Sequence, residues 1–514
     1  MGEITLKNAN LVRKIYFVGI KGVGMASLAE IAVDAGFIVA GSDVAEEFIT
    51  DKVLEAKKIK VDTGFHVSDL EKFIGGKINE TLVVTTAAHN GLSNPQCQFA
   101  LDKGINVLTH GQAVGYFMTG ELFKKTFTGV SVLGCHGKTT VSAMFATALS
   151  KVGLNPSYSV GTSEIFPLGP AGHLGAGEYF VAEADEFISD VQKDRTVKFL
   201  YQYPRYAIIN NIDFDHPDVY KNLDEVKKTF EKFCLENIKD NGVLFANGDD
   251  KNLSLLIDNV LLSRKDIKII TYGENEANDY QIKSFNEIGW GSEFEVFCKG
   301  KNLGGFELSV PGYHNAKNML AAIGFLNELG IPFEQIKKAV AAFRGTKRRQ
   351  EKLGSTKNGA IVIDDYAHHP DEIDKTLGAV KNAFPEKKIL CLFQPHTLSR
   401  TVAFKNEFAL AFSKADQVLF LPIFTSKREG ETNYDQIYGS IKKAMQENGV
   451  NVSFLTDERN DAELDTPPYF LPKNRLNVLE YIQKNFDSKR WAIVCLGAGD
   501  LYRIGLDMVS KDLK

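Results

Sequence analysis

The stretch Gly134-Cys135-His136-Gly137-Lys138-Thr139-Thr140 decides the fold at the centre of this 514-residue chain. It follows the apolar run 130–133, which predicts a buried strand, and precedes residues 141–149, whose Ala, Met, Phe and Leu content favours a helix. A strand, a glycine turn and a helix form a cradle for phosphate, because backbone N–H groups and the helix N-terminus face the anion. Lys138 adds a positive charge, and the Thr139 hydroxyl is a ligand for Mg²⁺. The stretch therefore predicts binding of a nucleoside triphosphate.

The composition indicates a globular protein of several domains. The chain is too long for one hydrophobic core, and 44% apolar with 24% charged residues is ordinary for soluble proteins. A net charge of −5 leaves no basic surplus to neutralise phosphates, so we expect no nucleic-acid partner. Residues 1–14 lack the apolar core of a signal peptide, and no apolar run approaches the ~20 residues that span a bilayer. The six cysteines lack paired spacing, which favours reduced thiols. Together with the apolar pattern, this predicts a cytoplasmic protein without membrane contact.

A second glycine turn lies near the N-terminus. The predicted strand 15–20 runs into Gly22-Val23-Gly24 and a predicted helix at 26–35, where the backbone can approach a diphosphate. The next predicted strand ends in Ser42 and Asp43, where a dinucleotide fold places its ribose-binding acid. These residues predict a nucleotide site. NAD is one candidate ligand, and a turn that only packs helix against strand is the alternative.

Carboxylates and a histidine follow two strands of the central region. The predicted strand 179–182 ends in Glu183-Ala184-Asp185-Glu186, and the predicted strand 206–211 runs into Asp213, Asp215 and His216. Oxygen ligands beside a phosphate loop suit Mg²⁺. The alternatives are a solvated acidic turn for the first cluster and a helix cap for His216.

The later part of the chain adds polar groups at a helix start and at strand ends. After His314, the side-chain amides of Asn315 and Asn318 at a predicted helix start can bind an adenine edge, although Asn315 is also an ordinary helix cap. The basic run 343–349 is predicted to be a hinge. Its composition fits either a solvated linker or an arginine clamp for phosphate. Strands are predicted at residues 360–363, 389–393, 417–421 and 491–496, and three of them end in polar groups where an open α/β sheet forms its ligand crevice.

The fold class predicted from this pattern is α/β with three domains. We expect a Rossmann-like N-terminal domain at residues 1–127, a central P-loop ATPase domain at 128–344 and a Rossmann-like C-terminal domain at 345–514. Residues 430–489 carry a weaker pattern.

Taken in order, these motifs resemble the Mur ligases along almost the whole chain. That family consists of ATP-dependent enzymes that form amide bonds in peptidoglycan precursor synthesis. The motifs that carry the resemblance are Gly134-Cys135-His136-Gly137-Lys138-Thr139-Thr140, Glu183-Ala184-Asp185-Glu186, Asn211-Ile212-Asp213 with Asp215-His216, His314-Asn315 with Asn318, Arg348-Arg349, and Asp364-Asp365-Tyr366-Ala367-His368-His369-Pro370.

The resemblance implies a reaction and a set of site residues. A carboxylate on a UDP-linked sugar would be activated by ATP and Mg²⁺ as an acyl phosphate, and the amine of an amino acid or short peptide would then attack it. The implied catalytic residues are Lys138, Glu183, His216 and Arg400. The implied ATP site comprises Gly134, His136, Gly137, Lys138, Thr139, Thr140, His314, Asn315, Asn318, Arg349 and Asp365. The implied UDP-sugar site comprises Gly22, Val23, Gly24, Ser42 and Asp43. His369 and Arg400 are implied on the amino-acid side, and the implied metal ligands are Thr139, Glu183 and His216.

Three alternatives remain open at this point. The incoming amine is either one amino acid or a recycled tripeptide, because segment 187–203 is similar to the tripeptide-adding members and Thr397 replaces a basic residue. An NAD-linked oxidoreductase built on the N-terminal glycine turn is a second enzyme class. A non-catalytic, ATP-gated sensor of cell-wall precursors is the third possibility. We expect small-molecule substrates and a monomer or homodimer.

Overall fold

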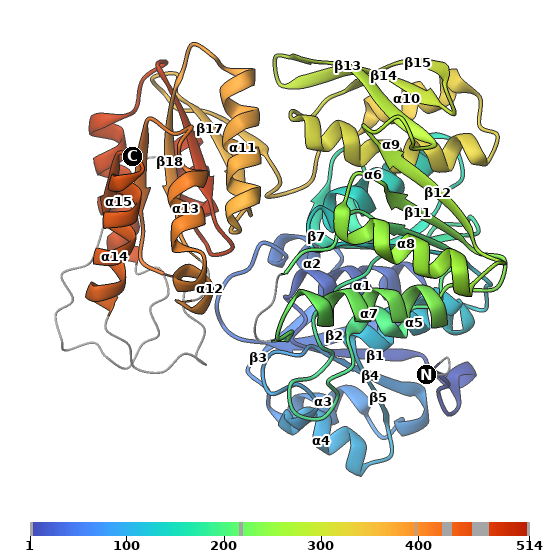
Figure 1. The fold of residues 1–514 in the computed structure, drawn as a ribbon. Helices are drawn as coiled ribbons and strands as arrows, with labels where there is room; N and C mark the ends of the chain where they lie inside the picture. Colours follow the sequence, from blue (N-terminus) through green and yellow to red (C-terminus); the bar gives the residue numbers. More distant parts are fainter. Residues whose placement is uncertain (1–3, 215–218, 396–397, 424–433, 455–471, 511–514) are drawn as a thin grey trace. The chain divides into compact units, whose positions relative to one another are not determined.

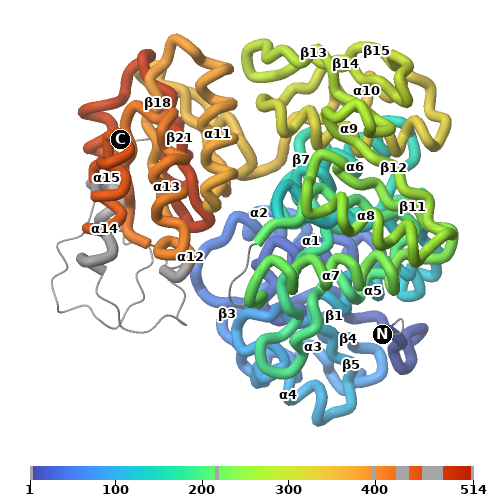
Figure 2. Tube along the Cα trace, in the orientation of Figure 1, coloured from blue at the N-terminus to red at the C-terminus, as the bar shows by residue number. Residues whose placement is uncertain are grey.

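The computed structural model describes residues 4–214, 219–395, 398–423, 434–454 and 472–510 (Figure 1). The chain divides into two compact units. The N-terminal unit contains Met1–Phe285, Phe294–Leu308 and Ala316–Arg344, and the C-terminal unit contains Asn286–Glu293, Ser309–Asn315 and Gly345–Lys514. The colours of Figure 2 follow the chain through both units.

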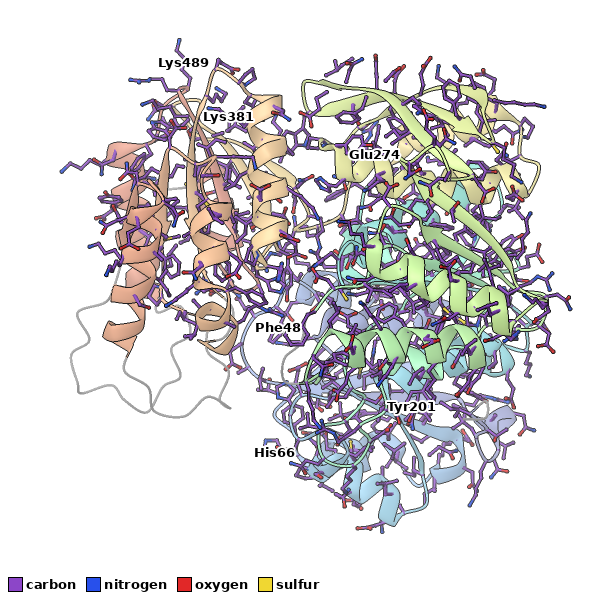
Figure 3. The ribbon with its side chains drawn as sticks, in the orientation of Figure 1. Phe48, His66, Tyr201, Glu274, Lys381 and Lys489 are labelled. Carbon is purple, nitrogen blue, oxygen red and sulfur yellow. The ribbon has the colours of Figure 1, made fainter. Side chains whose placement is uncertain are left out.

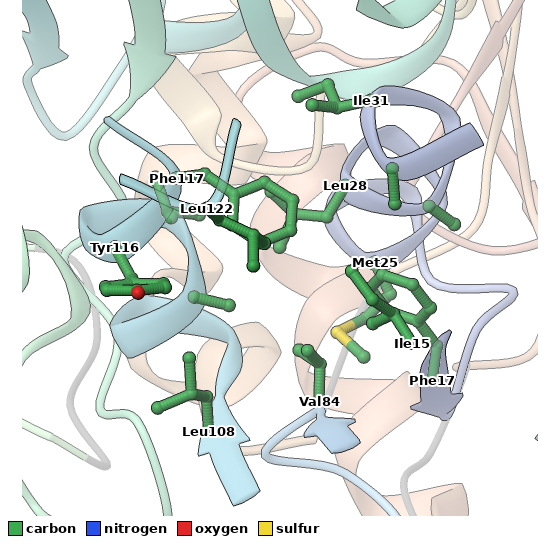
Figure 4. Packing of buried hydrophobic residues seen from close by; sticks show 14 of the residues in the cluster. Ile15, Phe17, Met25, Leu28, Ile31, Val84, Leu108, Tyr116, Phe117 and Leu122 are labelled. Atoms are coloured by element: carbon green, nitrogen blue, oxygen red, sulfur yellow. The ribbon is translucent and has the colours of Figure 1, made fainter. Parts of the chain in front are cut away.

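The first sheet of the N-terminal unit is parallel, with the strand order β3-β2-β1-β4-β5. Its elements are β1 (Lys14–Val18), α1 (Val23–Asp34), β2 (Ile38–Asp43), α2 (Asp51–Ala56), β3 (Lys60–Thr63), α3 (Val67–Ile74), β4 (Thr81–Thr85), α4 (Pro95–Asp102), β5 (Asn106–Thr109) and α5 (His110–Thr119). Ile15 and Phe17 pack with α1 and α5, a core seen in Figure 4. Tyr16 and Val18 face the other way, toward α3 and α4. Helices therefore cover both faces of the sheet, which explains why residues 15–18 of β1 are all buried.

The second sheet has the order β15-β14-β13-β12-β11-β10-β6-β9-β7-β8 among the described residues. Its elements are β6 (Thr128–Leu133), α6 (Lys138–Lys151), β7 (Ser157–Ile165), β8 (Gly169–His173), β9 (Tyr179–Glu183), β10 (Tyr206–Ile209), α7 (Leu223–Glu236), β11 (Val243–Asn247), α8 (Lys251–Ser263), β12 (Lys268–Gly273), β13 (Tyr280–Ile288), β14 (Gly291–Cys298), β15 (Lys301–Leu308), α9 (Tyr313–Glu328) and α10 (Phe333–Ala342). Strand β6 lies between β9 and β10 and is parallel to both. The loops that follow these three strands therefore meet at one edge of the sheet.

Helix α1 packs directly on the hairpin formed by β7 and β8. The hydroxyl groups of Ser27 and Ser159 lie 2.8 Å apart, and the N–H of Gly172 donates to Glu30 Oε2 at 2.7 Å. A Cβ on Gly172 would lie 1.8 Å from the Ser27 carbonyl oxygen, so only glycine permits this approach. The first two sheets are thus joined through packed backbone.

Segment 187–203 makes a second connection between the two sheets. Asp190 Oδ2 accepts a 2.7 Å hydrogen bond from the N–H of Leu92, and Asp190 Oδ1 accepts from Gln192 and Lys193. Gly91 has a φ of 50°, and a Cβ there would lie 1.9 Å from Asp190 Oδ2. Leu92 lies in the connection that follows β4, so the segment is anchored beside the carboxyl end of that strand.

The C-terminal unit contains a sheet of order β16-β17-β21-β18-β19-β20 among the described residues. Its elements are β16 (Glu351–Ser355), β17 (Ile361–Asp365), α11 (Pro370–Ala383), β18 (Lys388–Phe393), α12 (Leu398–Ala403), α13 (Lys405–Ala411), β19 (Gln417–Phe420), α14 (Tyr434–Glu447), β20 (Val452–Phe454), α15 (Pro472–Asn485), β21 (Trp491–Leu496) and α16 (Tyr502–Val509). Strand β16 is antiparallel to β17, and the remaining neighbours are parallel. Alternate residues of β18 pack on α11 and α13 or on α15 and α16. Charged side chains such as the exposed Lys489 project from this unit (Figure 3).

The predicted α/β class is confirmed, with three sheets that each carry helices. The helix predicted at 141–149 is longer and begins at Lys138, because Gly137 adopts a left-handed conformation and forms its N-cap. Within the part of the chain that the structure describes, no helix combines the length and apolar character needed to cross a membrane.

Candidate active site

The phosphate loop follows β6 and ends where α6 begins. Gly134 and Gly137 have φ values of 140° and 81°, which side chains of L-residues rarely adopt. A Cβ on Gly137 would lie 2.7 Å from Asn210 Nδ2 and 3.3 Å from Asn318 Nδ2, so the loop backbone lies tightly against two amides. The geometry is that of a helix N-terminus open to an anion, which fits the phosphate cradle predicted from the sequence.

Residues after β10 brace this loop. The N–H of His136 donates to Asn211 Oδ1 at 2.8 Å, and the His136 carbonyl accepts from the side chains of Asn211 at 2.9 Å and Asn210 at 3.1 Å. The Cys135 thiol donates to the carbonyl of Asp213 and accepts from its N–H. The loop conformation is therefore fixed by side chains that lie more than 70 residues away in the sequence.

Glu183 and Thr139 form the described part of the predicted metal site. Thr139 Oγ1 donates to Glu183 Oε1 at 3.0 Å, and the N–H of Gly161 donates to Glu183 Oε2 at 2.7 Å. A carboxylate and a hydroxyl at this spacing, beside a phosphate loop, fit the oxygen ligands that Mg²⁺ prefers. The third predicted ligand, His216, lies outside the described residues. Within the described ranges, no three His, Cys, Asp or Glu side chains group as metal ligands.

Lys138 is paired with Glu186, a member of the acidic cluster that the sequence analysis placed near Mg²⁺. Its Nζ lies 2.9 Å from Glu186 Oε1 and 2.8 Å from Oε2, and it donates to the Cys135 carbonyl at 3.0 Å. Burial alone would lower the pKa of Lys138, but the charge and hydrogen bond of Glu186 outweigh it and raise that pKa above its ordinary value. Lys138 is therefore a cation held against the loop.

Asp185 and His110 extend this charged group toward the first sheet. Lys198 donates to Asp185 Oδ2 at 2.6 Å, and Lys198 together with the hydrogen bond from Phe187 N–H holds the pKa of Asp185 below its usual range despite burial. A Cβ on Gly24 would lie 2.5 Å from Nε2 of His110, which places that ring against the start of α1. Burial, helped by the charge of Lys198, lowers the pKa of His110 to about 4, so it is neutral at pH 7.

The N-terminal glycine turn is held by the acid predicted to bind ribose. Asp43 accepts from the N–H groups of Lys21 at 2.7 Å and Val44 at 2.8 Å, and the Ser42 hydroxyl donates to Gln96 Oε1 at 2.6 Å. Both side chains are buried. Their proposed contacts with a UDP-sugar stay a prediction, and in the structure they stabilise the turn itself. Sequence reasoning missed His89, whose Nε2 lies 3.5 Å from Asp43 Oδ1.

The C-terminal unit collects its predicted site residues at the ends of β17 and at α11. Arg348 donates to Asp364 at 3.2 Å and to the Gly497 carbonyl at 2.6 Å, and its guanidinium stacks on Tyr366 and Tyr502. Burial raises the pKa of Asp364 to about 7 against the opposing charge of Arg348. Arg348 is thus built into the core of this unit.

The predicted ATP ligands Arg349 and Asp365 lie near each other in this unit. Arg349 lies over the ring of Tyr366, with its guanidinium carbon 5.1 Å from the ring centroid. Asp365 accepts from the Thr376 hydroxyl at 2.6 Å, and burial raises its pKa to about 6 while Arg349 acts to lower it. Asn315, a further predicted ligand, donates to the carbonyl of Pro311 and to Gln350 Oε1.

His369 and Arg400 are the residues predicted on the amino-acid side. His369 is the N-cap of α11 and accepts from the N–H of Asp371, in a capping box with Glu372. Its ring centroid lies 4.9 Å from that of Phe404, and the Phe404 N–H donates to the carbonyl of Arg400. The two predicted residues therefore lie in one neighbourhood, and both are buried.

The Mur ligase models match three successive regions of the chain. The Mur ligase family, catalytic domain model matches residues 14–121, the Mur ligase middle domain model residues 132–326, and the Mur ligase, glutamate ligase domain model residues 348–463. The chain belongs to the Mur ligase family. Because the family consists of ligases, the N-terminal glycine turn is no longer interpreted as the NAD site of an oxidoreductase.

Individual Mur ligases resemble the chain over nearly its full length. UDP-N-acetylmuramate–L-alanine ligase of Desulfitobacterium hafniense is 35% identical, with 96% of this chain and 99% of that protein covered. The enzyme of the same name from Clostridium acetobutylicum is 35% identical, with 98% of this chain and 99% of that protein covered. The crystal structure of UDP-N-acetylmuramate-alanine ligase from Thermotoga maritima is 25% identical with a TM-score of 0.73, over 96% of this chain and 98% of that one. A murein peptide ligase from Psychrobacter arcticus, 22% identical with a TM-score of 0.68, shares the fold.

Proposed function

We propose that this protein joins L-alanine to the carboxyl group of UDP-N-acetylmuramate in an ATP-dependent reaction of peptidoglycan precursor synthesis. The observation that carries the proposal is the phosphate loop with Lys138, Thr139 and Glu183 at one sheet edge, in a Mur ligase chain. The two relatives at 35% identity that carry this name support the choice of sugar and amino acid. Small-molecule substrates fit such a ligase.

The residues of the cradle have separate tasks in this proposal. The glycine turn and the start of α6 hold the phosphates, and Lys138 offsets negative charge as the sugar carboxylate approaches the γ-phosphate. Thr139 and Glu183, with His216, would hold Mg²⁺, which supplies further positive charge at the transferred group. The carboxylate oxygen bonds to phosphorus and ADP leaves. The amine nitrogen then bonds to the carbonyl carbon, a proton leaves that nitrogen, and inorganic phosphate departs.

The first experiment measures phosphate release from purified protein with Mg²⁺-ATP, UDP-N-acetylmuramate and L-alanine. We expect release that depends on both the sugar and the amine, and a product of the corresponding mass. Lys138→Ala is expected to abolish turnover while thermal unfolding stays near that of the wild type. Phosphate release that does not depend on the nucleotide sugar would contradict the proposal.

The same assay separates the two candidate amines. Segment 187–203, which Asp190 anchors beside the first sheet, is the part of the chain that left a tripeptide open as the incoming amine. L-alanine and the tripeptide L-Ala-D-Glu-diaminopimelate are therefore supplied separately and in competition, and kcat/KM is compared. We expect L-alanine to have the higher value. A preference for the tripeptide would assign the protein to cell-wall recycling.

The cap that the sequence offered as the alternative role of His216 is supplied by Asn222, whose side chain accepts from the N–H of Glu225 at the start of α7. His216→Asn is therefore expected to change the free energy of unfolding by no more than about 1 kcal/mol, the usual scale of a cap. If His216 holds Mg²⁺, turnover falls sharply in the same variant, and the Mg²⁺ concentration needed for half-maximal rate rises. Near-normal turnover would leave Thr139 and Glu183 to carry the metal site.

A further inference from the structure

Glu186 is the member of the acidic stretch after β9 that lies deepest in the protein. Only 3% of the residue is exposed, and both of its carboxylate oxygens lie within 2.9 Å of Lys138 Nζ. The same ammonium group donates to the carbonyl of Cys135 in the phosphate loop. The lysine that the proposed function assigns to ATP therefore lies between the loop backbone and a carboxylate.

The surroundings fix Glu186 in this position. The Tyr220 hydroxyl donates to the Glu186 carbonyl oxygen at 2.9 Å in a buried hydrogen bond, which holds the backbone. The neighbouring Asp185 has Lys198 as a cation of its own, at 2.6 Å. Two adjacent carboxylates thus pair with two different lysines, and Glu186 is the one matched to Lys138.

The charge of Glu186 has two opposite effects at a phosphate site. It holds the flexible four-carbon side chain of Lys138 in one conformation, which favours a reaction that needs the ammonium at a fixed point. It also places a negative charge beside the position that phosphate oxygens must approach, and like charges repel strongly where water is excluded. A residue in this position should improve the chemical step and weaken the binding of the nucleotide.

We propose that Glu186 is a positioning residue for Lys138, which fixes the ammonium for phosphoryl transfer at the expense of nucleotide affinity. The proposal rests on the proposed ATP-dependent function. It goes beyond the assignment of Lys138, Thr139 and Glu183, because Glu186 holds the lysine in place for the chemical step and lowers nucleotide affinity by its charge.

The test compares Glu186→Gln, which removes the charge at nearly constant shape, with Glu186→Asp, which keeps the charge but shortens the side chain. The control Glu178→Gln makes the same chemical change at an exposed residue just before the other end of β9. Affinity for ATP is measured by calorimetry in EDTA, so that Mg²⁺ does not contribute. Turnover is measured in the ligation assay, and thermal unfolding is recorded for each variant.

Glu186→Gln is expected to bind Mg²⁺-free ATP about tenfold more tightly, since one like charge has left the site. Its kcat is expected to fall at least about tenfold, because the ammonium is no longer fixed. Glu186→Asp should bind ATP like the wild type and still lose kcat, and Glu178→Gln should match the wild type in both measurements. A simple loss of structure would weaken binding and turnover together.

Two results would overturn the proposal. One is ATP affinity in Glu186→Gln that is equal to or weaker than that of the wild type. The other is an unchanged kcat in Glu186→Asp, which remains decisive even if Glu186→Gln does not fold. If the wild-type protein forms no amide at all, the proposed function fails, whereas the affinity comparison in EDTA still tests the effect of Glu186 on Lys138.

Discussion

Glu30 offers a prediction whose size follows from the structure. This residue lies within α1, is 1% exposed, and accepts a hydrogen bond from Gly172 across the contact between the first two sheets. Burial raises its pKa from 4.5 to about 7, although Gly172 and the charge of Lys57 act in the opposite direction. Between these two pH values the folded protein holds a proton that the unfolded chain releases. Stability therefore falls as the pH rises from about 4.5 to 7.

The magnitude follows from the two pKa values. A difference of one in pKa corresponds to about 1.4 kcal/mol, so ionisation of Glu30 should cost the folded state about 2–3 kcal/mol between pH 5 and 8. Glu30→Gln removes the titration and keeps an oxygen that can accept from Gly172. The free energy of unfolding of the variant, relative to that of the wild type, should therefore increase by that amount as the pH rises from 5 to 8.

The assay is urea unfolding at pH 5 and pH 8, followed by circular dichroism. Both tryptophans, Trp290 and Trp491, belong to the C-terminal unit, so their fluorescence reports that unit and serves as an internal reference. We expect Glu30→Gln to leave the tryptophan transition in place, and Glu71→Gln, at an exposed residue, controls for the loss of a charge. The same difference between wild type and Glu30→Gln at both pH values would refute the reasoning.

Three further substitutions have defined outcomes. Gly161→Ala places a Cβ 2.8 Å from Glu183 Oε2, so turnover should fall by about tenfold or more and the Mg²⁺ requirement should rise, as measured by Mg²⁺ titration of the rate. Arg348→Ala leaves the buried Asp364 without its cation and should cost about 3–5 kcal/mol of unfolding free energy, read from tryptophan fluorescence. Gly91→Ala combines a left-handed φ with a Cβ that would lie 1.9 Å from Asp190 Oδ2, so it should cost about 1–3 kcal/mol of unfolding free energy, measured by circular dichroism. Unchanged unfolding transitions in Arg348→Ala and Gly91→Ala would contradict these two stability predictions.

The elements around the phosphate loop could be predicted because their signals are local. A run of apolar residues, a pair of glycines and a helix-forming segment determine β6, the turn and α6 within about 20 residues. The strand before Glu183 was predicted for the same reason. Parallel pairing of β6 with β9 then brought Glu183 to Thr139, as strand ends in one sheet edge require.

The contacts that could not be predicted join residues far apart in the sequence. Glu186 reaches Lys138 across 48 positions, and Asp190 reaches Leu92 across 98. His110 was missed as well, although it directly follows β5, and polar residues after parallel strands were the signal used elsewhere. Burial decided the role of Arg348, because the sequence indicated only a solvated linker or a phosphate clamp for the basic run, whereas the side chain of Arg348 is 5% exposed and donates within its own unit.

The packing of α1 on the β7–β8 hairpin has a consequence for substrate choice. One end of α1 begins at the glycine turn proposed for the nucleotide sugar, and its body contacts Ser159, two residues before the backbone N–H that holds Glu183. No flexible linker separates the two positions. The distance between them is therefore fixed, and under the proposed function it would select substrates by the length of the arm that carries the acid. A nucleotide sugar whose acid arm is too short or too long would bind at one end and leave its carboxylate away from the phosphate loop.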